Sequence, residues 1–342
     1  MYVIMAEKIS FYGLSGSGKS CFIFAMSQAL SQGIQLSDEQ LLQVITPDPR
    51  QMLRLYKAYE KMVNGSWPAG TDVSVTYNFN VRKALDLLMS IEITDFRGGL
   101  LDSLEEDDQE EQEKLFKSYK DSSVLLFFFG ADKVKSAMQG NTSALMNFLH
   151  FNTLYESYLS SSPNGRNTPV MVIISKSDML TQSELSQAYA FVKNRMAQLF
   201  GKGTNLTVGI TAVSLGRNLI NDGGELEGEL DIRATAGNLS IPVLFSLYHI
   251  MAMRIENTVG RIASTESSIR SSKNDLGYEL SRSAFSRFFV NNEDEIRKRI
   301  NSHTAALGDE KNLLLKLNSS MTAIKKFLLS GAELYSNGNR IQ

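Results

Sequence analysis

One stretch decides how the N-terminal part of this chain folds: Lys8-Ile9-Ser10-Phe11-Tyr12-Gly13-Leu14-Ser15-Gly16-Ser17-Gly18-Lys19-Ser20. Its first five residues form a short apolar run typical of a strand, and the apolar residues 21–30 that follow it predict a helix. The glycine-rich middle matches the pattern G-x-x-x-x-G-K-[ST], which requires this order of strand, loop and helix. The segment therefore predicts a phosphate-binding loop rather than a glycine- and serine-rich turn that binds nothing.

The residue types of this loop each suit one part of a phosphate site. Glycines let the loop turn its backbone N–H groups inward around an anion, and the positive end of the helix dipole faces the same place. Lys19 is expected to reach the β and γ phosphates and the Ser20 hydroxyl to bind Mg²⁺, whereas Cys21 suits a small buried residue better than a redox sensor. The residues expected to contact the nucleotide here are Gly13, Ser15, Gly16, Ser17, Gly18, Lys19, Ser20 and Cys21.

Strand and helix patterns alternate over roughly the first 250 residues. Strict alternation of apolar residues over 73–81 predicts a half-buried strand, and residues 87–93 are expected to pair with it as an antiparallel hairpin. Residues 124–129 and 170–174 are apolar throughout, as in central strands of a parallel sheet, and 206–213 is a further candidate. These patterns predict an α/β fold with a mostly parallel six-stranded sheet that contains one antiparallel strand.

The C-terminal part of the sequence shows helical patterns and no strand pattern. Apolar residues step by three and four from Ile296 to Leu328, and less regularly from Ile255 to Leu280. Two helices joined near Asn291-Asn292 are expected to form an antiparallel hairpin or coiled coil, within the chain or against a partner; alternatively they cover the core of the sheet domain. The chain is therefore divided into residues 1–255 and a helical extension, residues 256–342.

Two aspartates follow predicted strands. Asp95, in Asp95-Phe96-Arg97-Gly98, ends the 87–93 run, where a carboxylate can hold Mg²⁺ and the Gly98 N–H can meet a γ-phosphate. Asp178, in Ser175-Lys176-Ser177-Asp178, follows the 170–174 strand at the edge where open α/β sheets bind nucleotides. A carboxylate accepts hydrogen bonds from N1–H and the exocyclic amine of guanine, whereas adenine offers an acceptor at N1. Asp178 therefore indicates guanine, with the Lys176 stem along the base. The alternative is an exposed polar loop without a role in binding.

This ordered set of motifs over residues 8–255 resembles the translation-factor-related (TRAFAC) class of P-loop GTPases. The resemblance implies a G domain that binds GTP or GDP with Mg²⁺, and a switch-loop threonine on the metal. Thr71 matches that threonine's place, although it also suits a loop residue that caps a turn, and the long stretch before it suggests an inserted helix. The family's fifth element, whose backbone contacts the base, corresponds to 211–213, with Ala212 and Val213, or to 214–216.

Two positions depart from the family pattern. Ser175 replaces the usual Asn or Thr, but its hydroxyl can still tie its loop to the phosphate loop. Gly99 stands where Ras-like enzymes carry the glutamine that orients the attacking water. We therefore expect a GTP-hydrolysing switch, with Lys19, Thr71 and Arg97 as catalytic groups, or alternatively a non-hydrolysing GTP/GDP-binding interaction protein. An ATP-dependent P-loop enzyme, with Ser175–Asp178 a coincidence, is a third possibility.

Composition restricts the other classes of function. With a net charge of -2, one cysteine and three histidines among 342 residues, the chain predicts neither a zinc cluster nor a broad nucleic-acid surface. No apolar run reaches the roughly 20 residues of a spanning helix, and no signal-peptide pattern opens the sequence, so a cytoplasmic location is expected. Peripheral membrane contact stays open. The expected partner is another protein or a second copy of the chain, bound through the G domain or the C-terminal helices.

Overall fold

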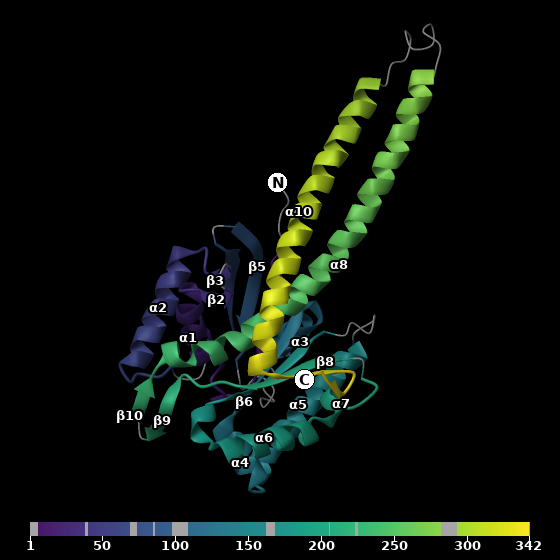
Figure 1. The fold of residues 1–342 in the computed structure, drawn as a ribbon. Coiled ribbons are helices and arrows are strands. Elements are labelled where there is room, and N and C mark those ends of the chain that lie inside the picture. The colour runs from purple at the N-terminus through teal and green to yellow at the C-terminus, as the bar shows by residue number, and fades with distance from the viewer. Residues whose placement is uncertain are drawn as a thin grey trace. The chain divides into compact units, whose positions relative to one another are not determined.

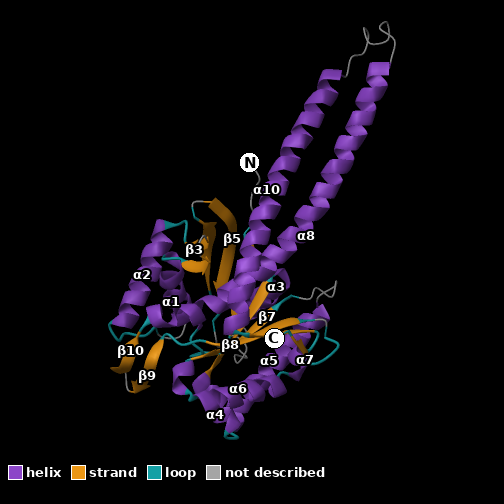
Figure 2. Cartoon of the chain, viewed as in Figure 1, coloured by secondary structure: helices purple, strands orange, loops and turns teal. Residues whose placement is uncertain are grey.

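The computed structural model of the chain describes residues 6–37, 40–68, 74–84, 86–97, 109–161, 168–204, 206–222, 225–281 and 293–341 (Figures 1 and 2). The chain forms two compact units. The first contains Met1–His249 together with Ala323–Gln342, and the second contains Ile250–Thr322. Residues 323–342, which were expected in the helical extension of residues 256–342, belong to the unit that holds the sheet.

A mixed sheet forms the centre of the first unit, in the order β12-β11-β8-β7-β6-β1-β5-β4-β3-β2. Five neighbouring strands run parallel: β5 (Asp86–Asp95), β1 (Glu7–Tyr12), β6 (Val124–Gly130), β7 (Val170–Ser175) and β8 (Thr207–Ala212). β4 (Val75–Lys83) pairs antiparallel with β5, in the hairpin expected from the sequence. The α/β class is therefore confirmed.

The sheet is larger than the six strands expected. β2 (Ile34–Ser37) and β3 (Gln40–Ile45) continue it antiparallel beyond β4, and β11 (Glu333–Ser336) and β12 (Asn339–Arg340) continue it antiparallel beyond β8. These four strands are short, and short segments carry too few residues for a clear alternation of apolar and polar side chains. The pairing with a neighbouring strand decides their structure.

Helices connect the strands: α1 (Lys19–Ser31), α2 (Pro49–Val63), α3 (Gln109–Asp121), α4 (Ala131–Met138), α5 (Thr142–Ser161), α6 (Gln182–Arg195) and α7 (Ala197–Phe200). The inserted helix expected before Thr71 is α2. It begins where the Asp48 side chain accepts a hydrogen bond from the Arg50 N–H and Pro49 occupies the first turn. Thr181 and Glu184 form a capping box that starts α6.

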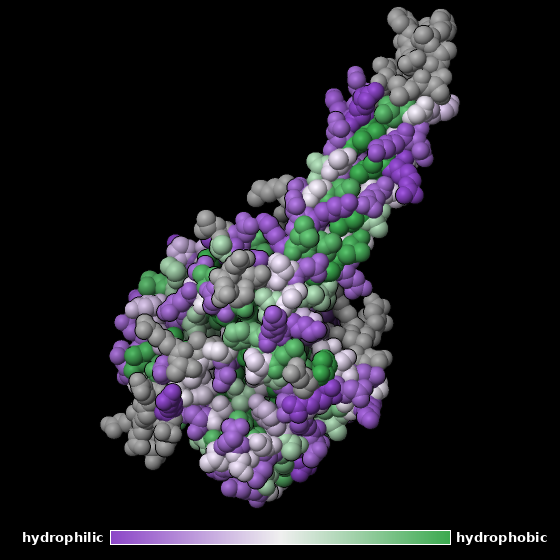
Figure 3. Space-filling model, viewed as in Figure 1, coloured by the Kyte–Doolittle hydropathy of each residue, from purple (hydrophilic) through white to green (hydrophobic). Residues whose placement is uncertain are grey.

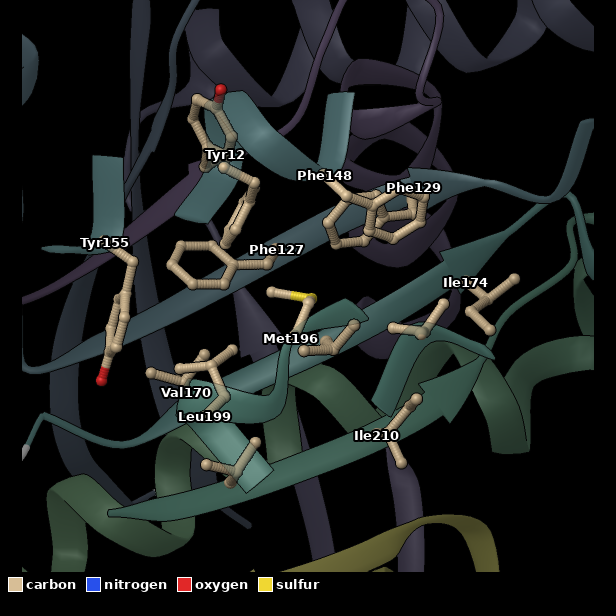
Figure 4. Packing of buried hydrophobic residues seen from close by; sticks show 14 of the residues in the cluster. Tyr12, Phe127, Phe129, Phe148, Tyr155, Val170, Ile174, Met196, Leu199 and Ile210 are labelled. Carbon is tan, nitrogen blue, oxygen red and sulfur yellow. The ribbon is translucent and has the colours of Figure 1, made fainter. Parts of the chain in front are cut away.

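Aromatic packing fixes the position of the central strands. β6 and β7 are buried along their whole length. The rings of Phe129 and Phe148 stack with their centroids 4.8 Å apart, and those of Phe127 and Phe151 meet edge to face at 4.1 Å, so α5 packs against β6 (Figure 4). Each such buried phenylalanine contributes about 1.5–3 kcal/mol. The loops that follow β6 and β7 therefore start from rigid ends.

Two long helices, α8 (Ile232–Ser281) and α10 (Glu293–Gly331), contribute to both units. In the second unit they form an antiparallel pair, linked by ion pairs from Arg261 to Glu310 (3.1 Å) and from Lys311 to Glu266 (3.0 Å) (Figure 1). Hydrophobic side chains form a stripe along this pair (Figure 3). Of the two arrangements expected for a helical hairpin, within the chain or against a partner, the α8–α10 pair is the one within the chain. The connection near Asn291-Asn292 lies outside the described residues.

The remaining parts of these helices belong to the first unit. Leu239 and Leu244 of α8 and Leu328 of α10 are buried. A side chain at Gly331 would collide with Ile241, so the end of α10 packs closely on α8 there. The Thr211 hydroxyl of β8 donates a hydrogen bond to the Gly331 carbonyl oxygen at 2.9 Å, so the end of α10 also lies against the sheet.

One stretch of α8, Gly237–Tyr278, is long and apolar enough to cross a membrane by length and composition alone. However, 61% of its most apolar window is buried inside the protein. Buried core helices meet the same criterion, so this stretch is weak evidence for a membrane span and does not contradict the expectation of none.

Candidate nucleotide-binding site

The loop of residues 13–18 joins β1 to α1 in a shape that needs glycine. Gly16 and Gly18 have φ angles of 74° and 82°, in the left-handed region that other residues rarely adopt. A Cβ atom at Gly13 would lie 2.7 Å from the Phe128 carbonyl oxygen. No described side chain caps the start of α1 at Gly18, so the first backbone N–H groups of that helix suit an anion.

Lys19 lies folded over this loop. Its side chain is buried, and Nζ donates hydrogen bonds to the Gly13 carbonyl oxygen at 2.5 Å and to that of Leu14 at 3.4 Å. Burial lowers the pKa of the Lys19 ammonium, and the nearby Asp95 carboxylate opposes that shift. Among the described residues the hydrogen-bond acceptors of Lys19 Nζ are these carbonyl oxygens, which carry no full charge, so the site favours an anionic ligand.

Ser20 and Asp95 meet because β5 lies beside β1. Phe11 is the register partner of Asp95, and the Ser20 hydroxyl donates a hydrogen bond to Asp95 Oδ2 at 2.6 Å. Asp95 is fully buried, and its Oδ1 has no hydrogen-bond partner among the described residues. Burial raises the pKa of this carboxyl, and the Ser20 hydrogen bond and the Lys19 charge lower it.

These two side chains fit a hard divalent cation. A buried carboxylate oxygen without a donor is costly, and carboxylate and hydroxyl oxygens are ligands that Mg²⁺ accepts. No group of three or more His, Cys, Asp or Glu residues that could hold a metal occurs in the described part of the chain. Mg²⁺ at Ser20 and Asp95 would need further oxygen ligands, which water and a bound phosphate can supply.

Ser175 connects a second loop to the phosphate loop. It ends β7 and is buried, and its hydroxyl donates a hydrogen bond to the Ser17 carbonyl oxygen at 2.6 Å. The tether expected from the sequence is therefore present, although Ser175 and Ser17 lie far apart in the chain. The Ser17 hydroxyl is buried without a hydrogen-bond partner among the described residues.

Lys176 has a left-handed backbone (φ 56°) that turns the chain sharply after β7. Its Nζ lies 3.5 Å from Asp132 Oδ1, at the start of α4. Asp132 was not among the residues expected here from the sequence. The available signal was its place just after β6, the neighbour of β7 in the sheet.

Asp178 lies in a single helical turn, η2 (Ser177–Met179), and is partly exposed. Its Oδ2 accepts a hydrogen bond from the Leu219 N–H at 2.8 Å. Leu219 belongs to β9 (Gly216–Asp222), which pairs with β10 (Glu225–Leu230) in a separate two-stranded sheet. This hairpin was not expected from the sequence, although Asp222-Gly223-Gly224 is a turn signal of the kind that joins two strands.

The segment after β8 lies beside the segment after β7. The Val213 carbonyl oxygen accepts from the Ser177 N–H at 3.1 Å, and the Val213 N–H donates to the Ile174 carbonyl oxygen at 2.9 Å. The Ser214 hydroxyl instead bonds to its own turn at Gly216. Of the two positions considered for the fifth family element, 211–213 is the one tied to the Asp178 segment.

The other expected site residues are linked to this site by fewer contacts or lie outside the described residues. The Arg97 N–H donates to the Ser74 hydroxyl at 3.4 Å. Thr71 and Gly98 lie outside the described residues. Cys21 is partly buried in α1, and burial raises the pKa of its thiol to about 11, so at neutral pH it is a protonated thiol rather than a reactive thiolate.

Comparison with known proteins adds no family to this picture. No protein-family model matches the sequence, and no curated protein is significantly similar to it.

Proposed function

We propose that the sheet-bearing unit is a G domain of the TRAFAC class that binds GTP and GDP with Mg²⁺ and hydrolyses GTP to GDP and phosphate. The observation that carries the proposal is the hydrogen bond from the Ser175 hydroxyl to the Ser17 carbonyl oxygen. It joins the loop that would hold phosphates to the loop that would read the base. A random glycine turn and a random polar loop have no reason to be connected in this way.

The strand order supports the same function. In the order β4-β5-β1-β6-β7-β8, the segments that follow β1, β5, β7 and β8 emerge at the carboxyl edge of the parallel strands. Open α/β sheets bind nucleotides at that edge. The phosphate loop, Asp178 and Val213 follow β1, β7 and β8, and Asp95 is the last residue of β5.

Each residue then has a defined task. Lys19 would exchange the Gly13 and Leu14 carbonyl oxygens for phosphate oxygens, which are stronger acceptors. Ser20 and Asp95 would hold Mg²⁺, which when bound neutralises charge on the β and γ phosphates. Asp178 would accept the two guanine N–H groups, with Lys176 along the base and the Val213 backbone beside it.

Hydrolysis is attack of water on the γ-phosphate. Gly99 in place of the usual glutamine leaves the orientation of that water to another group, such as Arg97, a potassium ion or a second copy of the chain. The same residue favours a second candidate function, a GTP/GDP-binding interaction protein that does not hydrolyse GTP. In either case the C-terminal helices would couple the nucleotide state to a partner or to self-association.

Two measurements test this proposal. A fluorescent GDP analogue titrated into the full chain with Mg²⁺ should bind, and excess GTP but not excess ATP should displace it. Displacement by both nucleotides alike would reject the guanine assignment. Single-turnover incubation with GTP, Mg²⁺ and K⁺ at high protein concentration should release phosphate, whereas tight binding without release would leave the non-hydrolysing function.

A further inference from the structure

The β9–β10 hairpin contacts the Asp178 segment through its backbone. Asp178 Oδ2 accepts the Leu219 N–H at 2.8 Å, and β9 lies against η2. Apart from this contact, the hairpin is a separate two-stranded sheet and adds no strand to the central one. Its position beside Asp178 therefore suggests a role at that carboxylate.

An irregularity in the hairpin explains why the Leu219 N–H is available. The register runs from Glu227 opposite Ile220 to Glu229 opposite Arg217. Two residues of β9, Asn218 and Leu219, thus oppose the single residue Gly228 of β10, which is the definition of a β-bulge. A bulge takes a residue out of the ladder and redirects its groups, and such bulges are frequent next to functional sites.

We infer that this bulge is a positioning device for base recognition: the Leu219 N–H holds the Asp178 carboxylate in the orientation that accepts guanine. The inference rests on the function proposed above. An ionised carboxylate has about four acceptor sites, so Oδ2 can keep the Leu219 N–H and still accept from the base. A carboxylate already held in one orientation loses less conformational freedom when the base binds.

The same hydrogen bond could instead lower the affinity for guanine. If the Leu219 N–H occupied the acceptor site that guanine needs, the hairpin would compete with the base, and its removal would strengthen binding. The two consequences differ in sign, so one substitution separates them.

The experiment replaces the Leu219 N–H by an ester oxygen. Nonsense suppression with the α-hydroxy analogue of leucine at position 219 of the full chain keeps the side chain and removes only the donor. GDP affinity should fall severalfold, by up to about tenfold, because the freed Asp178 carboxylate must then be ordered when the base binds. Affinity for inosine diphosphate, which lacks the exocyclic amine, should fall less, so the preference for GDP over inosine diphosphate should shrink.

Two further variants make the result specific. Leu219→Pro removes the same donor by another route and should shift the preference in the same direction. Arg217→Ala changes an exposed side chain of the same strand and should leave the preference as in the wild type.

The outcomes are distinguishable. If the wild type binds GDP and the ester variant binds it equally well or more tightly, the positioning role is wrong while the proposed function stands. If the wild type does not bind GDP with Mg²⁺, the proposed function fails and this inference fails with it.

Discussion

The phosphate side and the base side of the candidate site are built differently. Within the described residues, the phosphate side is one continuous loop, residues 13–20, together with the distant residue Asp95. Its charged groups are buried: Lys19 is 5% exposed and Asp95 0%. The base side assembles Asp132, Ser175–Asp178, Val213 and Leu219 from four segments, and Asp178 in its centre is partly exposed.

This difference separates affinity from selectivity. Buried charges interact strongly because little water screens them, so the phosphate side should supply most of the binding free energy for any nucleotide. The base side relies on directional hydrogen bonds to partly exposed groups, which contribute less energy but distinguish one base from another. Substitutions on the two sides should therefore produce different kinds of defect.

The largest effect is expected from Lys19→Ala. Removing the buried ammonium deletes the charge-assisted hydrogen bonds to the phosphates, and GDP and GTP should both bind at least about a hundredfold more weakly. Fluorescent-nucleotide titration measures this loss. Lys8→Ala, which removes an exposed lysine of β1 paired with Asp121 at 3.7 Å, is the matched control. Retained affinity in Lys19→Ala, with folding verified by circular dichroism, would contradict the phosphate assignment.

Asp178→Asn should change the base preferred rather than abolish binding. The asparagine amide would present an N–H donor opposite the exocyclic amine of guanine, which is also a donor. Xanthine carries an oxygen acceptor in place of that amine. The ratio of affinities should therefore shift from GDP toward xanthosine diphosphate by about ten- to a hundredfold. Competition between the two nucleotides measures the change, with Asp121→Asn as an exposed control. Unchanged GDP affinity would remove Asp178 from base recognition.

Ser175→Ala tests the connection between the two sides. It removes the donor to the buried Ser17 carbonyl oxygen, so the free energy of unfolding should fall by about 1–3 kcal/mol. Because the phosphate loop loses its tether, GDP should also dissociate faster, by up to about tenfold. Denaturant unfolding and stopped-flow displacement measure the two effects, and Ser175→Thr, which keeps the hydroxyl, should restore both. A Ser175→Ala protein identical to the wild type in both assays would show that the tether has no role.

The smallest effect is a severalfold dependence of affinity on pH. Burial raises the pKa of the Asp95 carboxyl, so protons compete with Mg²⁺ at a higher pH than they would at an ordinary aspartate, and affinity should fall toward acid. Burial lowers the pKa of Lys19, so this side chain should lose its positive charge at a lower pH than an ordinary lysine. Nucleotide affinity should therefore also fall as the pH rises. GDP titrations between about pH 5 and 9, with Mg²⁺ and with EDTA, give the profile. Asp95→Asn should lack the Mg²⁺-dependent acid limb; its persistence there would assign it to another group.

Local patterns in the sequence were sufficient for much of the fold. The strands β1, β5, β6, β7 and β8 were expected at nearly their observed positions, because long apolar or alternating runs depend on neighbours in the chain. The short strands β2, β3, β11 and β12 were missed, because their structure depends on the strand beside them.

The same distinction holds for the candidate site. The sequence by itself singled out the loop of residues 13–20, since its glycines, lysine and serine are adjacent in the chain and each residue type suits one part of a phosphate site. It also indicated Asp95, Asp178 and the Ser175 hydroxyl. Only the tertiary structure decided that Ser175 donates to Ser17, that Asp132 pairs with Lys176, and that Leu219 donates to Asp178. The Leu219 donor and the Ser17 acceptor are backbone groups, which nearly every residue carries. The residue type therefore cannot identify them, and only the path of the chain brings them to the site.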